Sequence, residues 1–266
     1  MKKKKTNTKK IGIITGGCGL LGWEYAKSLI EINYKIIIFD NNLAKIKQRK
    51  NSLKKTNLDI EIKKVDITNE KNLKNKIKDI ITRHKTIDLL INNAAIDFKP
   101  IKKNIKLQNH FLDFDLKRWE QEISVGLTGA FLCSKHVGKY MVNKKNGIIL
   151  NIASDLSIIA PNQNLYSHLK TVKPVSYSII KHGIHGLTKY LAALWAGFNI
   201  RVNTLSPSGV KNNQDQIFIK KIKKLIPMKR MANLNEYNET IKYLCSDRSS
   251  YLTGQNIVID GGRTII

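Results

Sequence analysis

The sequence predicts an α/β protein: a single doubly wound, Rossmann-type domain with a parallel sheet of about seven strands. Apolar runs typical of buried strands alternate with longer amphipathic stretches, and a glycine-rich turn follows the first run. The 266 residues, 42% of them hydrophobic, are enough to bury one sizeable core. In such folds ligands bind at the carboxyl ends of the strands.

The first half of the chain divides into seven elements. Short runs rich in Ile, Val and Leu indicate strands, and longer stretches with apolar residues every three or four positions indicate helices. In chain order we expect a strand over residues 11–15, a helix over 19–30, a strand over 35–39, a lysine-rich helix, a strand ending near 65–66, a helix over 70–83 and a strand over 87–91.

The second half continues this alternation after a loop predicted over residues 100–115. We expect a long helix over 116–141, a strand over 147–152, a helix over 175–197, a strand over 200–205, a helix over 236–245 and a strand over 257–260. No repeat or linker interrupts the series. The sequence therefore predicts a flexible basic tail over residues 1–10 and one domain over 11–266.

The cysteines and the start of the chain indicate the cellular compartment in which we expect the protein. Cys18, Cys133 and Cys245 are far apart and show no C-x-x-C spacing, so we expect reduced thiols and no disulfide framework. The basic start resembles the first part of a signal peptide, but the apolar run after it is short and glycine-rich. No run approaches the roughly 18 apolar residues of a membrane span. We expect a cytoplasmic protein with no membrane partner.

The formal net charge of +27 invites a nucleic-acid interpretation. Only seven of the 47 basic residues are Arg, and the lysines are spread through nearly every segment without a recognition motif. We therefore expect no nucleic-acid partner. A positive field would still attract small anionic ligands such as a dinucleotide or a nucleotide-sugar.

A glycine-rich turn follows the first predicted strand, in the stretch Thr15-Gly16-Gly17-Cys18-Gly19-Leu20-Leu21-Gly22. Small residues there let backbone N–H groups and a helix N-terminus approach a pyrophosphate. Glycine turns also arise from tight packing alone, and Asp40 changes the balance between the two interpretations. At the end of the second strand a carboxylate can accept hydrogen bonds from the adenosine ribose and repels a 2′-phosphate. With no basic residue at Gly17 or Asn41, the pattern favours NAD(H) over NADP(H).

Tyr177 and Lys181 are four residues apart, so on a helix they share one face. A tyrosine is a poor acid or base at neutral pH, and a nearby ammonium favours its anionic form. The pair can therefore act as a general acid/base in the interconversion of an alcohol and a carbonyl. A Tyr and a Lys four residues apart are common by chance. The catalytic interpretation of this pair therefore depends on the other motifs in the sequence.

Together these motifs resemble the short-chain dehydrogenase/reductase family over nearly all of residues 10–263. The resemblance rests on Thr15-Gly16 with Gly22, Asp40, Asp66, Asn92-Asn93-Ala94, Ser154, Tyr177, Lys181, residues 203–207 and Thr253-Gly254. It implies that Ser154 holds the substrate oxygen, that Tyr177 transfers the proton, and that Lys181 binds the nicotinamide ribose and tunes Tyr177. The implied cofactor-binding residues are Thr15, Gly16, Gly19, Leu21, Gly22, Asp40, Asp66, Ile67, Asn93, Ala94, Tyr177, Lys181, Pro207, Gly209 and Val210.

The sequence departs from the family pattern in several places. Leu20 replaces a glycine of the turn, and Ser208 replaces the glycine of a Pro-Gly pair. Gly126 stands in place of the family's catalytic asparagine, so either another group holds the relay water or the relay is less ordered. Tyr177 lies 23 positions after Ser154, which indicates an insertion over residues 155–173 at the mouth of the site.

Other polar residues have two readings. His168, in the insertion, either contacts substrate or belongs to the surface, and Lys170 and Lys173 become substrate contacts only if the substrate is anionic. We expect no metal site, because no H-E-x-x-H pattern or acidic cluster accompanies the histidines.

The predicted function is a reversible, NAD(H)-dependent interconversion of a secondary alcohol and a ketone on a small-molecule substrate. The insertion and the segment 206–215 resemble enzymes of bacterial surface-sugar and flagellin-glycan pathways, which favours a sugar or nucleotide-sugar. The alternatives are a 3-oxoacyl carrier-protein reductase and a weakly catalytic protein that senses NAD. By the same resemblance we expect a homodimer or homotetramer, paired through the helices over 116–141 and 175–197.

Overall fold

Seven parallel strands form one sheet, in the order β3-β2-β1-β4-β5-β6-β7. The computed structural model describes residues 9–96 and 109–266; the predicted tail, apart from its last two residues, and most of the predicted loop over 100–115 lie outside them. The strands are β1 (Lys10–Thr15), β2 (Tyr34–Asp40), β3 (Ile60–Lys64), β4 (Leu89–Asn92), β5 (Gly147–Ile152), β6 (Ile200–Pro207) and β7 (Asn256–Ile259). The predicted fold class is confirmed. The strand order reverses between β1 and β4, where such folds bind ligands.

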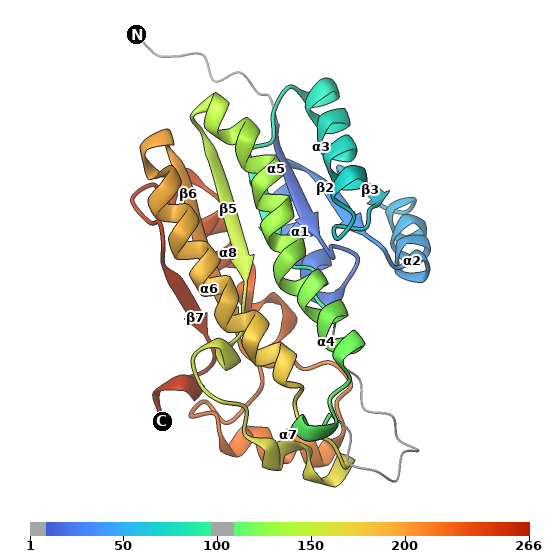
Figure 1. Cartoon of the computed structure of the whole chain (residues 1–266), viewed down its shortest axis with the longest axis vertical. Coiled ribbons are helices and arrows are strands. Elements are labelled where there is room, and N and C mark those ends of the chain that lie inside the picture. Colours follow the sequence, from blue (N-terminus) through green and yellow to red (C-terminus); the bar gives the residue numbers. More distant parts are fainter. Residues whose placement is uncertain (1–8, 97–108) are drawn as a thin grey trace.

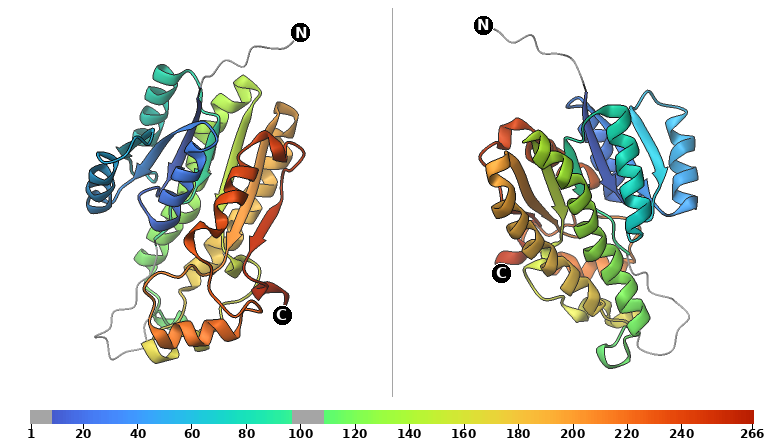
Figure 2. Two further views of the ribbon diagram at one scale, coloured as in Figure 1. Left: turned by 180° about the vertical axis from the view of Figure 1, so that it is seen from behind. Right: turned by 45° about the horizontal axis from the view of Figure 1, so that its top comes forward.

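Helices cover both faces of the sheet (Figures 1 and 2). They are α1 (Leu20–Ile30), α2 (Leu43–Leu53), α3 (Glu70–His84), α4 (Leu116–Ile123), α5 (Gly129–Lys144), α6 (Val175–Trp195), α7 (Gln216–Lys224) and α8 (Asn238–Leu244). Helices α1 and α8 pack on one face, and α3, α5 and α6 pack on the other. Within the described ranges, no helix has the length and apolar character needed to cross a membrane.

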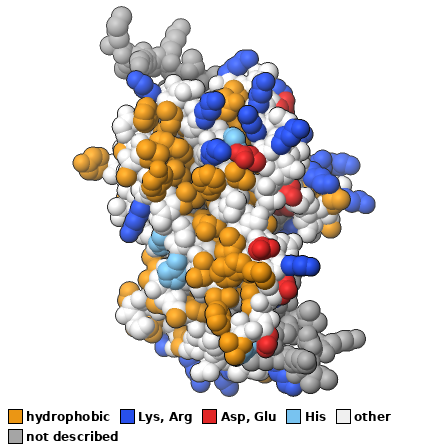
Figure 3. Space-filling view, in the orientation of Figure 1, with side chains coloured by type: hydrophobic (Ala, Val, Ile, Leu, Met, Phe, Trp, Pro, Cys, Tyr) orange, Lys and Arg blue, Asp and Glu red, His pale blue; other side chains and the backbone are white. Residues whose placement is uncertain are grey.

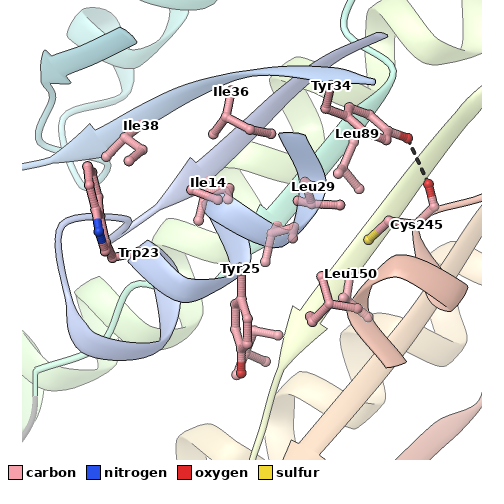
Figure 4. Close-up of a cluster of buried hydrophobic side chains, with 14 of the residues drawn as sticks. Ile14, Trp23, Tyr25, Leu29, Tyr34, Ile36, Ile38, Leu89, Leu150 and Cys245 are labelled. Carbon is pink, nitrogen blue, oxygen red and sulfur yellow. Dashed lines mark hydrogen bonds between the residues drawn. The ribbon is translucent and has the colours of Figure 1, made fainter. Parts of the chain in front are cut away.

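Alternate side chains of the strands enter the two cores, as the two-residue period of a strand requires. Ile36 and Ile38 of β2 join the core under α1 and α8, whereas Ile37 and Phe39 join the core under α3 and α5. Figure 4 shows the first core, where the Tyr34 hydroxyl donates to the Cys245 carbonyl oxygen at 2.8 Å. Because these side chains are almost fully buried, each contributes about 1.5–3 kcal/mol through the hydrophobic effect.

The helix predicted over residues 116–141 is confirmed as one unbroken helical run, but it is not α-helical throughout. The chain forms α4, a π-helical turn over Ser124–Thr128, and then α5. A π-turn accommodates one extra residue within a helix and is frequent at functional sites. It places Gly126, which is buried, against Ile180 of α6.

Helix α7 and the short helices of the insertion are structures that the sequence analysis did not predict. A 3₁₀ segment over Gln163–Leu169 packs against α7, with the rings of Tyr166 and Phe218 5.6 Å apart. Leu165 is buried together with Ile222 of α7. The insertion and α7 therefore form one small subassembly at the carboxyl end of the sheet, visible at the bottom of Figure 1.

Candidate active site

Ser154 and Lys181 both lie at the carboxyl end of β5. Ser154 lies two residues beyond the strand, and α6 begins at Val175, so Tyr177 and Lys181 lie on its first two turns. The Lys181 ammonium donates to the Ile152 carbonyl oxygen at 2.8 Å, and Lys181 is buried. This bond ties α6 to the end of the strand that carries Ser154.

Two ammonium groups lie near the ring of Tyr177. Lys173 Nζ is 3.8 Å and Lys181 Nζ is 5.7 Å from the centroid of its ring. Cations at these distances interact favourably with the ring and favour the phenolate over the phenol. All three side chains line one small cavity with Glu122 and Ile180. A phenol held in this field is a candidate general acid/base.

A buried ion pair stands behind Ser154. The Ser154 hydroxyl donates to Asp155 Oδ1 at 2.8 Å, and Arg263 Nη1 donates to Asp155 Oδ2 at 2.7 Å. Ser208 Oγ also donates to Asp155 Oδ2, at 2.8 Å. Ser208, a departure from the family pattern, is thus explained by its bond to Asp155.

The glycine turn between β1 and α1 provides the features that a pyrophosphate needs. Gly16 has φ +62°, a left-handed conformation that glycine adopts without strain. A Cβ at Gly22 would lie 2.8 Å from the Gly16 carbonyl oxygen and the Gly17 Cα, so only glycine fits this close approach. In the described chain no side chain caps the first turn of α1, which leaves its N–H groups as donors for a phosphate.

Thr15 and Asn93 hold this turn in place. The Asn93 amide nitrogen donates to the carbonyl oxygens of Thr15 and Gly16 at 3.0 and 3.2 Å. Thr15 Oγ1 accepts the backbone N–H groups of Asn93 and Ala94 at 3.0 and 3.1 Å. The residues predicted after β4 therefore connect directly to the turn after β1.

Asp40 lies beside the same turn. Its two carboxylate oxygens accept the backbone N–H groups of Cys18 and Asn42, at 3.0 and 2.9 Å. Arg49 also reaches this region: its Nε donates to the Cys18 carbonyl oxygen at 3.3 Å, and its guanidinium lies 4.6 Å from the Trp23 ring. The prediction from sequence considered only positions 17 and 41 for a basic residue near Asp40. It did not identify Arg49, which reaches this turn from α2.

Cys18 is not a reactive thiol despite its place in the turn. Burial, and then the negative charge of Asp40, raises the pKa of the Cys18 thiol to about 12. The thiolate, which is the reactive form, is therefore scarce at neutral pH.

The other predicted cofactor residues lie along the same edge of the sheet. Asp66 follows β3 and accepts two hydrogen bonds from Thr68, and the side chain of Ile67 is buried against α5, so only its backbone can face a cofactor. Pro207 ends β6, and Gly209 and Val210 follow it. Leu21, in the first turn of α1, packs against the core.

His168 has a structural partner. Its Nε2 lies 2.8 Å from Asp215 Oδ1, and Asp215 caps α7 through the Phe218 N–H. Burial alone would raise the pKa of Asp215, but the bonds from the Phe218 N–H and His168 lower it. His168 thus joins the insertion to α7. In the described part of the chain, no group of three or more His, Cys, Asp or Glu side chains could hold a metal ion.

The prediction from sequence did not include three residues of the site: Glu122, Asp155 and Arg263. Glu122 is four residues before Gly126 and therefore on the same helix face, a signal that was available. The pairing of Asp155 with Arg263 joins residues 108 positions apart, and no spacing rule reveals it.

Comparison with known proteins assigns the family. Residues 19–264 match a family model described as enoyl-(acyl carrier protein) reductase. A crystal structure of a short-chain dehydrogenase from Leptospira borgpetersenii with bound NAD+ is 31% identical, with a TM-score of 0.82, covering 99% of this chain and 97% of that one. The chain belongs to the short-chain dehydrogenase/reductase family. It is therefore an oxidoreductase of a family that acts on CH–OH groups.

Other members of the family resemble the chain over nearly its whole length. Flagellin modification protein A of Campylobacter coli is 30% identical over 259 residues, 95% of this chain and 97% of its own. An NAD-dependent glycerol dehydrogenase of Listeria innocua is 29% identical over 266 residues, 97% of this chain and 95% of its own. A gluconate 5-dehydrogenase from Burkholderia cenocepacia, solved with NADP and tartrate, is 25% identical with a TM-score of 0.82, covering 97% of this chain and 96% of that one. Family members thus bind either dinucleotide, and their substrates differ.

Proposed function

We propose that the protein is an NAD(H)-dependent dehydrogenase that interconverts a secondary alcohol and a ketone, with Tyr177 as the general acid/base. The observation that carries the proposal is the closeness of the Tyr177 ring to the ammonium groups of Lys173 and Lys181, of which Lys181 binds the Ile152 carbonyl oxygen at the end of β5. Ser154 would bind the substrate oxygen, and Tyr177 would take or give its proton. The nicotinamide supplies the hydride chemistry when bound. Thr15, Gly16, Gly22 and Asn93 would form the pyrophosphate side of its site.

NAD(H) is the proposed cofactor because of the charge at the end of β2. The Asp40 carboxylate, fixed by the N–H groups of Cys18 and Asn42, would meet the 2′-position of the adenosine ribose. The Asp40 carboxylate would repel a 2′-phosphate at that position. Arg49 is engaged with the Cys18 carbonyl oxygen and Trp23, which favours a ribose without a phosphate.

We propose a polyhydroxylated substrate, such as a sugar or nucleotide-sugar. The relatives include a flagellin modification protein and a glycerol dehydrogenase, which supports hydroxylated substrates. Lys173, whose ammonium lies 3.8 Å from the Tyr177 ring centroid, would suit an anionic group on such a substrate.

An acyl chain on a carrier protein is the second candidate, and helix α7 favours it. This helix carries Lys220, Lys221, Lys223 and Lys224 beside the insertion, a surface that suits an acidic carrier. The third candidate function is to sense NAD without turnover. The lysines around Tyr177 favour an active enzyme over this candidate.

A substrate panel separates the candidates. NAD+ reduction would be followed with hydroxy-sugars, nucleotide-sugars and polyols, and NADH oxidation with keto-sugars and a 3-oxoacyl thioester. We expect turnover with a sugar or polyol that Tyr177→Phe abolishes. Turnover of only the thioester would favour the carrier-protein reductase, and turnover of none by a protein that binds NAD tightly would favour the sensor.

We also propose a homodimer or homotetramer built on α5 and α6. Hydrophobic side chains gather on the face that these helices form (Figure 3), and Phe131, Ile179, Tyr190 and Leu194 are all about half exposed or more. Exposed apolar surface of this kind is typical of a protein interface.

A further inference from the structure

Gly126 lies in the π-helical turn, against the helix that carries Tyr177. A Cβ at this position would lie 2.7 Å from Ile180 Cγ2 and 3.0 Å from Cδ1, closer than packed atoms normally approach. Ile180 therefore occupies the space that an asparagine side chain at 126 would need. A polar group that serves this part of the site has to come from another residue.

Glu122 supplies such a group one helical turn earlier. It is only 4% exposed, and it lines the cavity that Tyr177 and Lys181 also line. Glu122 Oε1 accepts from Arg118 Nε at 2.8 Å, and Oε2 accepts from Ser176 Oγ. These two bonds offset part of the desolvation cost of a buried carboxylate, which persists only where it is paired.

The cavity has the size of one water molecule. The space open to a water's centre is about 10 Å³, close to the minimum that a single buried water needs. A buried water also needs two to four polar partners, and the lining offers Glu122, Lys173, Tyr177 and Lys181.

We propose that Glu122 holds a water molecule in this cavity and carries protons between Tyr177 and solvent during turnover. The inference rests on the proposed function, since it requires Tyr177 to exchange a proton with the substrate. In the oxidation direction, the Tyr177 phenolate takes the alcohol proton. The new O–H bond then breaks as this proton moves to the water, which releases another proton to a Glu122 oxygen.

Glu122 returns to its carboxylate form by losing that proton to solvent. Its partner Arg118 has a side chain that is 31% exposed, which places the solvent boundary one residue away. Reduction runs through the same bonds in the opposite direction, and no redox partner is involved. Because Glu122 acts on Tyr177 through water, it is a positioning residue and touches neither substrate nor cofactor.

A purely structural role for Glu122 makes different predictions. Its bond to Ser176 also holds the first turn of α6, so its loss could displace Tyr177 and slow turnover without any relay. A displaced Tyr177 would raise KM or lower stability, whereas a broken relay makes proton delivery rate-limiting. Among the residues that the structure describes, the charged groups that line the cavity with Tyr177 are Glu122, Lys173 and Lys181, and Arg118 binds Glu122 from behind.

The test replaces Glu122 with glutamine, which keeps the size of the side chain but cannot carry the proton. We expect kcat for alcohol oxidation to fall about 10- to 100-fold, part of the usual value of positioned proton transfer, with KM for NAD+ and alcohol nearly unchanged. The kcat of Glu122→Gln should rise with buffer concentration and show a larger solvent deuterium isotope effect than the wild type. Glu120→Gln, the same change at an exposed position of α4, should match the wild type.

Two further variants complete the test. Glu122→Asp keeps a carboxylate and should recover kcat at least severalfold over Glu122→Gln. If the glutamine variant does not fold, a buffer-dependent kcat in Glu122→Asp, absent from the wild type, carries the same evidence. Ser176→Ala should change KM or stability without buffer dependence.

The proposal is overturned if Glu122→Gln keeps wild-type kcat, or if its kcat falls without buffer dependence or a changed isotope effect. Tyr177→Phe separates this failure from that of the proposed function. An inactive Tyr177→Phe beside a normal Glu122→Gln overturns the relay alone. An active Tyr177→Phe overturns the proposed function itself.

Discussion

Arg263 Nη1 lies 2.7 Å from Asp155 Oδ2, and the two side chains are 5% and 3% exposed. Asp155 follows Ser154 directly and accepts its hydroxyl, while Arg263 lies in the final turn of the chain. The carboxylate also accepts the hydroxyl of Ser208, in the loop after β6. The C-terminal segment therefore supports both the proposed substrate side and the proposed cofactor side of the site.

The first prediction concerns this ion pair. Arg263→Met should lower the free energy of unfolding by about 3–5 kcal/mol, because it leaves a buried carboxylate without its charged partner. Asp155→Asn/Arg263→Met, which removes both charges, should recover more than half of that loss. Chemical denaturation measures both, with the exposed Arg248→Met as control. Equal losses in the single and double variants would show that the pair has no such role.

The fold was predictable because each strand is marked by a local run of apolar residues. The strand predicted over residues 147–152 matches β5, and β1 begins one residue before its predicted start. These runs are mostly apolar, since strands of a parallel sheet are buried on both faces. Helix α7 was missed because it is short and lysine-rich, and its packing comes from contacts with Leu165 and Tyr166 of the insertion, which are remote in sequence.

The site was predictable only where its residues form motifs. The spacing of Tyr177 and Lys181 indicates a shared helix face, but the contact of Lys181 with the Ile152 carbonyl oxygen depends on how α6 packs against β5. The π-turn has no distinctive local sequence, because the residues that form it also form ordinary helices. Its one local sign is Gly126, and Ile180 explains that glycine only once the two helices are packed.

The second prediction concerns the choice of cofactor. NAD(H) should bind at least about tenfold more tightly than NADP(H), a difference of about 1.4 kcal/mol, and Asp40→Ala should narrow the gap by removing the charge that opposes a 2′-phosphate. Asp40→Ala/Arg49→Ala should bind NADP(H) more weakly than Asp40→Ala, because Arg49 is a nearby cation that could pair with the phosphate. Fluorescence titration measures each affinity, with the exposed Asp247→Ala as control. Tighter binding of NADP(H) by the wild type would contradict the assignment.

The third prediction concerns Gly126. Gly126→Asn should destabilise the protein by about 1–3 kcal/mol, because its side chain must displace the Ile180 methyl groups in a packed region. In an Ile180→Ala background the same Gly126→Asn change should cost less stability than in the wild type, since the alanine opens the space that the asparagine needs. Gly186→Asn, on α6 where a Cβ meets nothing within 4 Å, is the control for adding this side chain to a helical glycine. Normal stability in Gly126→Asn would mean that Ile180 moves away at no cost.

The fourth prediction concerns assembly. Leu194→Glu and Tyr190→Glu place charges on the exposed face of α6, where the proposed interface would bury them. Either change should convert the oligomer into a smaller species, measured by light scattering at micromolar concentration with and without NAD+. Leu43→Glu, an exposed apolar residue on α2 at the other edge of the sheet, should leave the assembly unchanged. A monomeric wild type would refute the proposal.

The last prediction concerns the charge above Tyr177. Lys173 Nζ lies 3.8 Å from the Tyr177 ring centroid, so its positive charge favours the phenolate, which is the form that takes a proton from an alcohol. The kcat/KM for alcohol oxidation should therefore rise with pH as the Tyr177 phenol loses its proton. Lys173→Met should move this rising limb of the pH profile to higher pH. Glu122→Gln removes a negative charge from the same cavity and should move the limb to lower pH.

The opposite signs make the pair of variants informative, because a general distortion of the site would move both limbs in one direction. Lys170→Met, an exposed lysine three residues earlier, serves as control and should leave the profile in place. Added salt should shrink the effect of Lys173→Met only slightly, since the ammonium and the ring are too close for counterions to screen. If neither variant moves the limb, the titrating group is not Tyr177, and the general acid/base has to be sought among the other groups of the site.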